Sequence, residues 1–323
     1  MAVYTNVSDA EIAAFLRHYD LGNLVSLTGI AEGIENSNFQ LCTDHGAYIL
    51  TLYERRVDAG DLPYYLGLMD HLAARGLPCP TPIHDRGGGS LRSLCGKNAA
   101  IVTLLEGAWP RNPTGDECFM VGQALARTHI EGQDFHLIRP NTLSVSAWGG
   151  ILNDAGFVGD TLQAGLTKSA QTMVADLVQC WPENLPTGPI HADLFPDNVF
   201  FQDGELSGLI DFYFACTDAL AYDVAVTLNA WCFSVSGEFM TNLAARFLQG
   251  YNAVRVLTSS ELDALPTLAQ GAAMRFFVTR LYDWTNTPAD ALVVRKDPME
   301  FWHRACFHAN VKSTSDYGWA MTV

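Results

Sequence analysis

One short segment constrains the fold of this chain more than any other: His191-Ala192-Asp193-Leu194-Phe195-Pro196-Asp197-Asn198, followed by Leu209-Ile210-Asp211-Phe212. Two apolar runs, 199–201 and 206–210, lie between Asn198 and Asp211, and the turn residues Gln202-Asp203-Gly204-Glu205 separate them. This pattern predicts a β-hairpin. Because a hairpin brings its two ends together, we expect Asn198 and Asp211 to lie side by side.

The side chains around this hairpin suit phosphoryl transfer. A carboxylate such as Asp193 can receive the proton of an acceptor hydroxyl, while the amide oxygen of Asn198 and the carboxylate of Asp211 can hold Mg²⁺ against nucleotide phosphates. Asp and Asn also occur in loops for local reasons, because they satisfy backbone groups. The joint pattern favours the catalytic interpretation. For His191 we favour a structural role in the loop over a phosphate contact.

Composition narrows the class of protein. The 323 residues are 49% hydrophobic, enough for the core of a two-lobed enzyme. The net charge of −16 argues against nucleic acid or an anionic membrane as partner. The eight cysteines form no C-x-x-C pair, and no apolar run is long enough to span a bilayer. Because no basic segment followed by an apolar one opens the sequence, we expect no signal peptide. We predict a cytoplasmic enzyme with a small-molecule partner.

The pattern along the chain predicts an α+β fold. The N-terminal part reads mainly as strands, and capping boxes at Ser8 and Thr114 predict helices that run to about His18 and Ile130. We expect a small antiparallel-sheet lobe over residues 1–105 and a larger, mainly helical lobe over 106–323. Other predicted elements are the strands Ser37–Cys42 and Ala47–Tyr53, the helix Asp61–Arg75 and helical segments between Val145 and Gln179.

Several motifs carry a resemblance over nearly the whole chain: Gly33-Ile34-Glu35-Asn36-Ser37-Asn38-Phe39, Tyr48-Ile49-Leu50-Thr51-Leu52-Tyr53-Glu54, Gly76-Leu77-Pro78-Cys79-Pro80-Thr81-Pro82, the segments 191–198 and 209–212, and Arg275-Phe276-Phe277-Val278-Thr279-Arg280-Leu281-Tyr282-Asp283. With these, the chain resembles the aminoglycoside phosphotransferase and choline kinase superfamily, which has a protein-kinase-like fold. Within that superfamily it is most similar to bacterial homoserine kinases.

The resemblance implies an activity and roles for residues. It implies phosphorylation of the side-chain hydroxyl of L-homoserine to O-phospho-L-homoserine, a step of threonine biosynthesis, with ATP and Mg²⁺. By position, Asp193 is the catalytic base, Asn198 and Asp211 are the Mg²⁺ ligands, and Asp223 orders the C-terminal lobe.

The nucleotide site is less strongly marked. Gly29 and Gly33 bound a loop that can fold over phosphates, because glycine lets backbone N–H groups approach oxygen closely. The kinase-like architecture places Leu105 and Glu106 at the hinge that reads adenine.

The cation that pairs with the nucleotide phosphates is not evident. Kinases normally carry it as a Lys at the position of Thr51, and no Lys precedes Lys97. Thr51 is typical of the homoserine kinase subgroup. Arg55 or Arg56 can supply the charge, but for each of them a surface role is favoured.

A zwitterionic acceptor needs a carboxylate near its ammonium group, and an Arg or backbone donors near its carboxylate. Arg275 and Arg280 lie on one predicted helix, about 140° apart around its axis, so only one is expected to face the cleft. Arg280 and Asp283 share a helix face and form either a substrate-binding pair or an intrahelical salt bridge, which we favour. Tyr213 and Asp218 closely follow Asp211 and are further candidates for the acceptor side.

Two alternatives stay open. One is a kinase for another small hydroxyl compound, such as choline, a sugar or an aminoglycoside, whose positive charge would suit an acidic chain. The other is a catalytically silent nucleotide-binding protein, suggested by Thr51 and opposed by Asp193, Asn198 and Asp211. The sequence does not indicate an oligomeric state.

Overall fold

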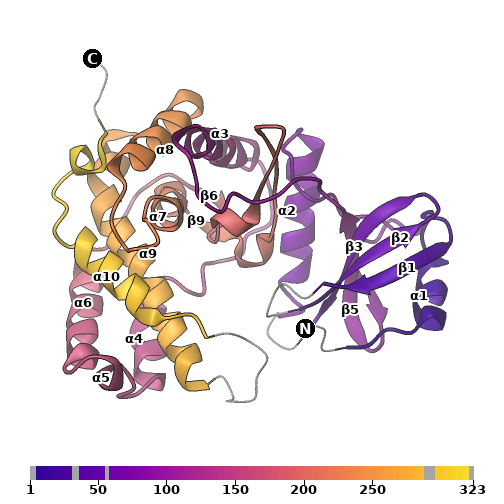
Figure 1. Cartoon of the computed structure of the whole chain (residues 1–323), viewed down its shortest axis with the longest axis horizontal. Helices are drawn as coiled ribbons and strands as arrows, with labels where there is room; N and C mark the ends of the chain where they lie inside the picture. Colours follow the sequence, from indigo (N-terminus) through magenta and orange to yellow (C-terminus); the bar gives the residue numbers. More distant parts are fainter. Residues whose placement is uncertain (1–4, 31–35, 55–57, 287–294, 320–323) are drawn as a thin grey trace. The chain divides into compact units, whose positions relative to one another are not determined.

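The computed structural model describes residues 5–30, 36–54, 58–286 and 295–319 (Figure 1). The chain forms two compact units. The first comprises Met1–Gly107 with Ser207–Tyr213, and the second comprises Ala108–Leu206 with Phe214–Val323. An antiparallel sheet dominates the first unit and helices dominate the second, so the predicted α+β class is confirmed.

The first unit is built on a five-stranded sheet with the order β1-β2-β3-β5-β4, in which every neighbouring pair is antiparallel. The predicted hairpin of residues 37–53 is confirmed: Cys42 pairs with Ala47 across it. The elements of this unit are α1 (Asp9–Leu16), β1 (Leu24–Gly29), β2 (Ser37–Thr43), β3 (Gly46–Tyr53), α2 (Leu62–Ala74), β4 (Arg92–Leu94) and β5 (Lys97–Thr103).

Successive side chains of β3 point to opposite faces of the sheet, and one of these faces packs on the core of the first unit. Leu50 and Leu52 are fully buried in a core that includes Ile12 and Phe15 of α1. Because successive side chains point to opposite faces, Thr51 and Tyr53 project from the other face. The capping box at Ser8 is present, and α1 ends at Leu16, two residues before the predicted end.

The second unit is a helical assembly around α7 (Leu220–Trp231), in which every residue from Leu220 to Asn229 is buried. A helix that is apolar all round belongs in the core, and Figure 1 shows α7 end-on among its neighbours α3, α8 and α9. The remaining helices are α3 (Gly115–Glu131), α4 (Val145–Asp154), α5 (Gly159–Leu162), α6 (Leu166–Cys180), α8 (Thr241–Val254), α9 (Ser259–Asn286) and α10 (Pro298–His308).

Two short strand pairs frame the loop that carries the candidate active site. β6 (Thr187–Ile190) pairs with β9 (Cys216–Ala219), which the sequence did not predict. β7 (Val199–Gln202) and β8 (Glu205–Leu209) form the predicted hairpin, within which the chain leaves the second unit and enters the first.

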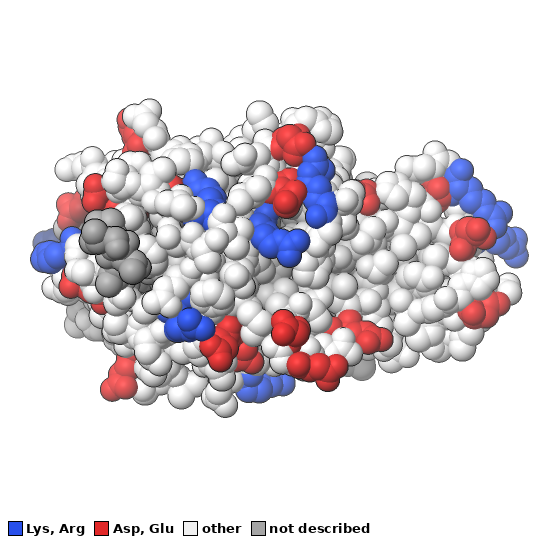
Figure 2. Space-filling view, turned by 90° about the horizontal axis from the view of Figure 1, so that it is seen from above, with Lys and Arg blue, Asp and Glu red and all other residues white. Residues whose placement is uncertain are grey.

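The surface carries charged side chains of both signs. Figure 2 shows Lys and Arg interspersed with Asp and Glu over the face that it presents. No helix in the described parts of the chain is both long enough and apolar enough to cross a membrane.

Candidate active site

The loop after β6 carries the predicted catalytic residues, and Ala192 sets its shape. Ala192 has a φ of 61°, in the left-handed region that a residue with a Cβ atom adopts when its surroundings impose it. Two hydrogen bonds do so here. The backbone N–H groups of His191 and Ala192 donate to the two carboxylate oxygens of Asp223, at 2.7 and 2.8 Å. One side chain therefore fixes the turn of this loop.

Asp223 is fully buried in the first turn of α7 and also contacts α3. The Nε2 atom of His129 lies 3.1 Å from Asp223 Oδ2, and its Nδ1 atom lies 2.7 Å from the Tyr251 hydroxyl. Since a carboxylate only accepts, we assign the ring proton to Nε2. Burial alone would raise the pKa of Asp223, but the hydrogen bond and charge of His129 and the amide of His191 hold it below its usual value. These hydrogen bonds agree with the ordering role that the resemblance implies for Asp223.

Asp193 follows Ala192 and has the environment of a general base. Its side chain is 18% exposed, so a hydroxyl can approach it. Burial raises the pKa of Asp193, and the nearby positive charge of Arg275 opposes that rise. The side-chain amide of Asn198 donates to the Asp193 carbonyl at 2.8 Å. This bond fixes which amide atom is the nitrogen and leaves the oxygen as the atom suited to a metal.

Pro196 shapes the stretch between these residues. Phe195 is extended, with a φ of −85° and a ψ of 164°, which is the usual conformation of a residue before proline. Residues Pro196–Asn198 form a single 3-10 turn, and β7 starts directly after it. The indole of Trp231 anchors the stretch by donating to the Leu194 carbonyl at 2.9 Å.

Asp211 lies in the first unit, two residues after β8, and also has a left-handed backbone, with a φ of 65°. Its charge acts on two tyrosines, Tyr53 and Tyr213. The Tyr53 hydroxyl donates to the Tyr213 hydroxyl at 3.2 Å, and the ring of Tyr213 meets those of Tyr53 and Tyr65 edge to face. Burial, with the charge of Asp211 adding to it, raises the pKa of Tyr53 well above 10. These hydroxyls are therefore neutral and can donate hydrogen bonds beside Asp211.

Asn198 and Asp211 each carry an oxygen of a kind that Mg²⁺ accepts as a ligand. Among the described residues, no group of three or more His, Cys, Asp or Glu side chains could hold a metal ion. Mg²⁺ does not need such a group, because it keeps several waters and is bound by one or two carboxylates together with substrate phosphates. An amide oxygen and a carboxylate are the oxygen ligands that it prefers. Joint binding by Asn198 and Asp211 stays a prediction.

Comparison with known proteins assigns the chain to a family. The sequence pattern of the phosphotransferase enzyme family matches residues 26–257. The chain belongs to this family. Homoserine kinases are among its relatives. The chain is 54% identical to the homoserine kinase of Acidiphilium cryptum (strain JF-5), over 98% of this chain and 100% of the relative. The identity to the homoserine kinase of Methylobacterium radiotolerans is 55%, over 98% of this chain and 99% of the relative. The expected resemblance is confirmed: this phosphotransferase is an ATP-dependent kinase for a small molecule.

Solved structures with low sequence identity share the fold. An amicoumacin kinase, 14% identical, superposes with a TM-score of 0.70 over 94% of both chains. A choline kinase from Cryptosporidium parvum, 12% identical, gives a TM-score of 0.66 over 94% of both chains. The kinase-like fold predicted from the sequence is confirmed.

Thr51 occupies the strand position at which kinases normally carry a lysine. In this phosphotransferase the Thr51 hydroxyl donates to Asn38 Oδ1 at 2.9 Å. Lys97, the first lysine of the chain, forms an ion pair with Glu54 at 2.9 Å. The hydrogen-bond partner of Thr51 is thus a neutral amide, and Lys97 is engaged by Glu54. Arg55 and Arg56, the other cations considered, lie outside the described residues.

The predicted nucleotide-binding residues of the phosphotransferase lie in the first unit. Gly29 ends β1 opposite Phe39, whereas Gly33 lies outside the described residues. The Glu106 carbonyl accepts a hydrogen bond from the Ser207 hydroxyl at 2.7 Å. Leu105 packs so closely on Gly208 that a Cβ atom there would lie 2.3 Å from Leu105 Cδ1. Their contact with a nucleotide stays a prediction.

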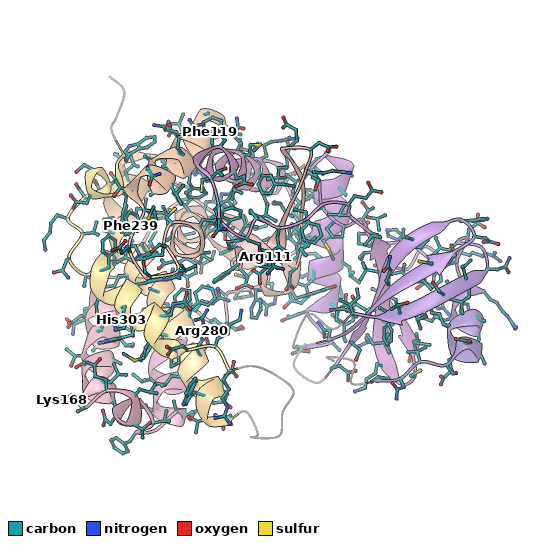
Figure 3. All side chains as sticks on the ribbon, viewed as in Figure 1. Arg111, Phe119, Lys168, Phe239, Arg280 and His303 are labelled. Atoms are coloured by element: carbon teal, nitrogen blue, oxygen red, sulfur yellow. The ribbon has the colours of Figure 1, made fainter. Side chains whose placement is uncertain are left out.

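The predicted acceptor residues have varied surroundings. Asp218, in β9, accepts from the Asn141 amide at 2.7 Å. Arg280 donates to Glu300 at 2.6 Å and to the Asp297 carbonyl at 3.0 Å, at the side of α9 next to α10 (Figure 3). Arg280 is thus in a salt bridge, but one between helices rather than the favoured one within a helix. Asp283 lies on α9 and Tyr213 beside Asp211.

The residue that the sequence analysis undervalued is Arg275. It is buried on α9, and its Nη1 atom donates to the Ala192 carbonyl. Its Nη2 atom lies 4.0 Å from Asp193 Oδ1. The separation of about 140° around the helix axis indicated that Arg275 and Arg280 have different surroundings. The structure places Arg275 beside Asp193 and Arg280 beside Glu300.

Proposed function

We propose that this kinase transfers the γ-phosphoryl group of ATP to the side-chain hydroxyl of L-homoserine, forming O-phospho-L-homoserine for threonine biosynthesis. The observation that carries the proposal is the 52–55% identity to homoserine kinases over 98% of the chain. The ordered loop around Asp193 supports it, because in-line transfer depends on positioning a hydroxyl.

In the proposed mechanism Asp193 orients the acceptor hydroxyl and takes its proton late in the transfer. The Asp223 carboxylate holds the turn from which Asp193 projects, and Asn198 braces the same backbone through its amide nitrogen. Asn198 and Asp211 are the proposed Mg²⁺ ligands, and the bound ion would neutralise charge on the phosphates. Gly29, Gly33, Leu105 and Glu106 are proposed to contact the nucleotide.

Other features of the chain support the proposed setting. The described cysteines are free thiols, and four of them are buried, which suits a reducing cytoplasm. The acidic balance supports a small-molecule substrate rather than nucleic acid.

The first test is ADP production with MgATP against L-homoserine, L-serine, L-threonine, choline, methylthioribose and kanamycin. Large stimulation by L-homoserine alone is the expected result. Stimulation by another compound would keep the kinase chemistry and replace the substrate. ADP production without any acceptor-dependent rate would favour the silent nucleotide-binding alternative suggested by Thr51.

Two variants test the proposed roles. Asp193→Ala is expected to lower kcat by about 10²- to 10⁴-fold while MgATP still binds, because the base acts only on the acceptor proton. Asp211→Ala is expected to abolish Mg²⁺-dependent nucleotide binding instead. Calorimetric titration with MgATP and steady-state kinetics measure the two effects. Unchanged turnover in Asp193→Ala would remove the base assignment.

A further inference from the structure

We propose that Arg275 binds the carboxylate of the acceptor and makes the kinase specific for an α-amino acid with a side-chain hydroxyl. The inference rests on the proposed function and names the residue that reads its substrate. It concerns a positioning contact to substrate, in addition to the bond that Arg275 makes to the loop.

Arg275 is held in place beside the catalytic base. Its side chain is only 4% exposed, and its guanidinium carbon lies 4.4 Å from the centre of the Phe276 ring and 5.3 Å from that of Phe214. Its Nη1 atom donates to the Ala192 carbonyl. Stacking and this bond together fix the plane of the guanidinium, so its other nitrogens have a set direction.

The Nε and Nη2 atoms of Arg275 make no hydrogen bond to the described residues. Its Nη2 atom is 4.0 Å from Asp193 Oδ1, which is too long for a hydrogen bond. Among the described residues, Ala192 is the only hydrogen-bond acceptor found for Arg275. Nε and Nη2 of Arg275 have no hydrogen-bond partner in the described parts of the chain, yet neither belongs to the fully buried polar atoms without a partner. These two nitrogens are therefore in contact with solvent-accessible space. A buried guanidinium with free donors is a site for an anion, and a carboxylate matches its fork.

The spacing suits one acceptor molecule. A hydroxyl must lie within hydrogen-bond distance of the Asp193 carboxylate to be activated. In L-homoserine the hydroxyl oxygen and the carboxylate carbon are roughly 5 Å apart when the chain is extended. Because Arg275 Nη2 is 4.0 Å from Asp193 Oδ1, a molecule with its hydroxyl on Asp193 can reach Arg275 with its carboxylate.

Three other arginines of the second unit already have ion-pair or hydrogen-bond partners. Arg280 and Arg304 both pair with Glu300 and both stack on the Phe301 ring at 4.4 Å. Arg139 donates to the Ala215 carbonyl at 3.3 Å. Arg275 therefore offers unused donors next to the base. The same charge would repel choline or an aminoglycoside, which adds selection against cationic acceptors.

The experiment compares two acceptors in two variants. L-homoserine and L-homoserinamide differ only in that the amide carries no negative charge. With Arg275→Met, kcat/KM for L-homoserine is expected to fall by about 10- to 100-fold, mainly through KM, because charge-assisted hydrogen bonds to the carboxylate are lost. For L-homoserinamide the fall should be several-fold smaller, because that acceptor is affected only through the bond of Arg275 to the Ala192 carbonyl. Equal losses for both acceptors would overturn the proposal.

Arg304→Met is the matched control. Arg304 is also buried, also donates to a backbone carbonyl, that of Asn229, and also stacks on phenylalanine rings. Its replacement is expected to lower Tm and to leave the ratio of the two kcat/KM values unchanged. If Arg275→Met does not fold, Arg275→Lys replaces it, because lysine keeps the charge but lacks the fork. A fall specific to L-homoserine supports the proposal, and equal falls overturn it.

The outcomes separate the two levels of inference. Wild-type enzyme that shows no L-homoserine-dependent turnover removes the proposed function, and the role of Arg275 falls with it. Normal wild-type turnover with equal losses in Arg275→Met removes only the role of Arg275.

Discussion

At the scale of single residues, the carboxylate of Asp223 accepts hydrogen bonds from two adjacent backbone amides of the loop and from the imidazole of His129. These bonds hold Ala192 in a left-handed conformation, which costs on the order of 1 kcal/mol or more for a residue with a Cβ atom. The direction of the Asp193 side chain therefore depends on a residue that touches no substrate.

This dependence predicts the effect of Asp223→Asn. An amide has one accepting oxygen and no charge, so it cannot serve both loop amides. We expect kcat to fall by about 10- to 100-fold and Tm to decrease. Kinetics and thermal melting measure the two effects. The control is Asp203→Asn at the exposed hairpin turn, where a φ of 52° suits asparagine and both quantities should be retained. Wild-type kcat in Asp223→Asn would contradict the role given to this residue.

His308 predicts how stability depends on pH. Burial, reinforced by the charge of Arg304, lowers the pKa of His308 from 6.5 to about 3. Between these values the unfolded chain binds a proton that the folded protein does not. Stability is therefore complete above about pH 6.5 and falls, as the pH decreases towards 3, by up to about 1.4 kcal/mol per pH unit from this residue.

Urea unfolding of wild type and His308→Gln at several pH values between 7.5 and 4.5 measures this slope. The variant is expected to be less stable at neutral pH, because His308 contacts the Tyr317 hydroxyl at 2.7 Å, and to have a shallower acid slope. Parallel slopes would show that His308 does not titrate as described.

At the scale of elements, two glycines let α3 and α8 approach closely. A Cβ atom at Gly122 would lie 2.2 Å from the Phe247 carbonyl oxygen, and one at Gly250 would lie 2.0 Å from that of Phe119. These obstacles are backbone atoms, which side-chain motion cannot relieve. The contact needs a glycine from each helix.

Alanine substitutions should separate this contact from ordinary helical glycines. Gly122→Ala and Gly250→Ala are expected to destabilise the protein by about 2 kcal/mol or more, because the helices must move apart. Gly149, in α4, has open space around its Cβ position. Gly149→Ala should therefore be neutral or stabilising by up to about 1 kcal/mol. Denaturant unfolding of all three variants checks the difference, and similar stabilities would contradict the close contact.

The elements also show what the sequence can predict. Capping boxes and apolar periodicity located α1, α3 and the hairpins, because these signals are local. The strands β6 and β9 were missed because they have four residues each, and β6 contains a glycine and a proline. Their pairing depends on residues far along the chain.

The same distinction holds for the candidate site. The pattern at 191–198 located Asp193 and Asn198 because the loop is one continuous segment. The bond of Arg275 to Ala192 joins residues 83 positions apart, and that of Arg280 to Glu300 joins different helices. Which arginine lies beside the base follows from the packing of α9, which no local pattern encodes.

At the scale of the whole molecule, the reactivity of the eight cysteines reports how well the two units stay closed around their buried side chains. Cys180 is exposed, Cys79, Cys118, Cys216 and Cys232 are buried, and the other three are intermediate. Burial raises the pKa of Cys79, Cys118 and Cys216 to about 12. Since the thiolate is the reactive form, these thiols should be inert in the folded protein.

Reaction with a thiol reagent at pH 8 is expected to show one fast thiol and, after unfolding, all eight. Cys180→Ser should remove the fast phase and leave the slow ones. Dithiothreitol should not change Tm, because these cysteines are free. Rapid labelling of Cys118, Cys216 or Cys232 in the native protein would mean that the second unit opens readily.

The arrangement around Asp223 has a practical consequence for measurements made during heating. The amides of the catalytic loop and the imidazole of His129 in α3 share the carboxylate of Asp223. The loss of activity on heating should therefore report when the contact between α3 and α7 is lost. Turnover should cease at the temperature at which α3 loosens from α7, even while the circular dichroism of the remaining helices still reports a folded protein.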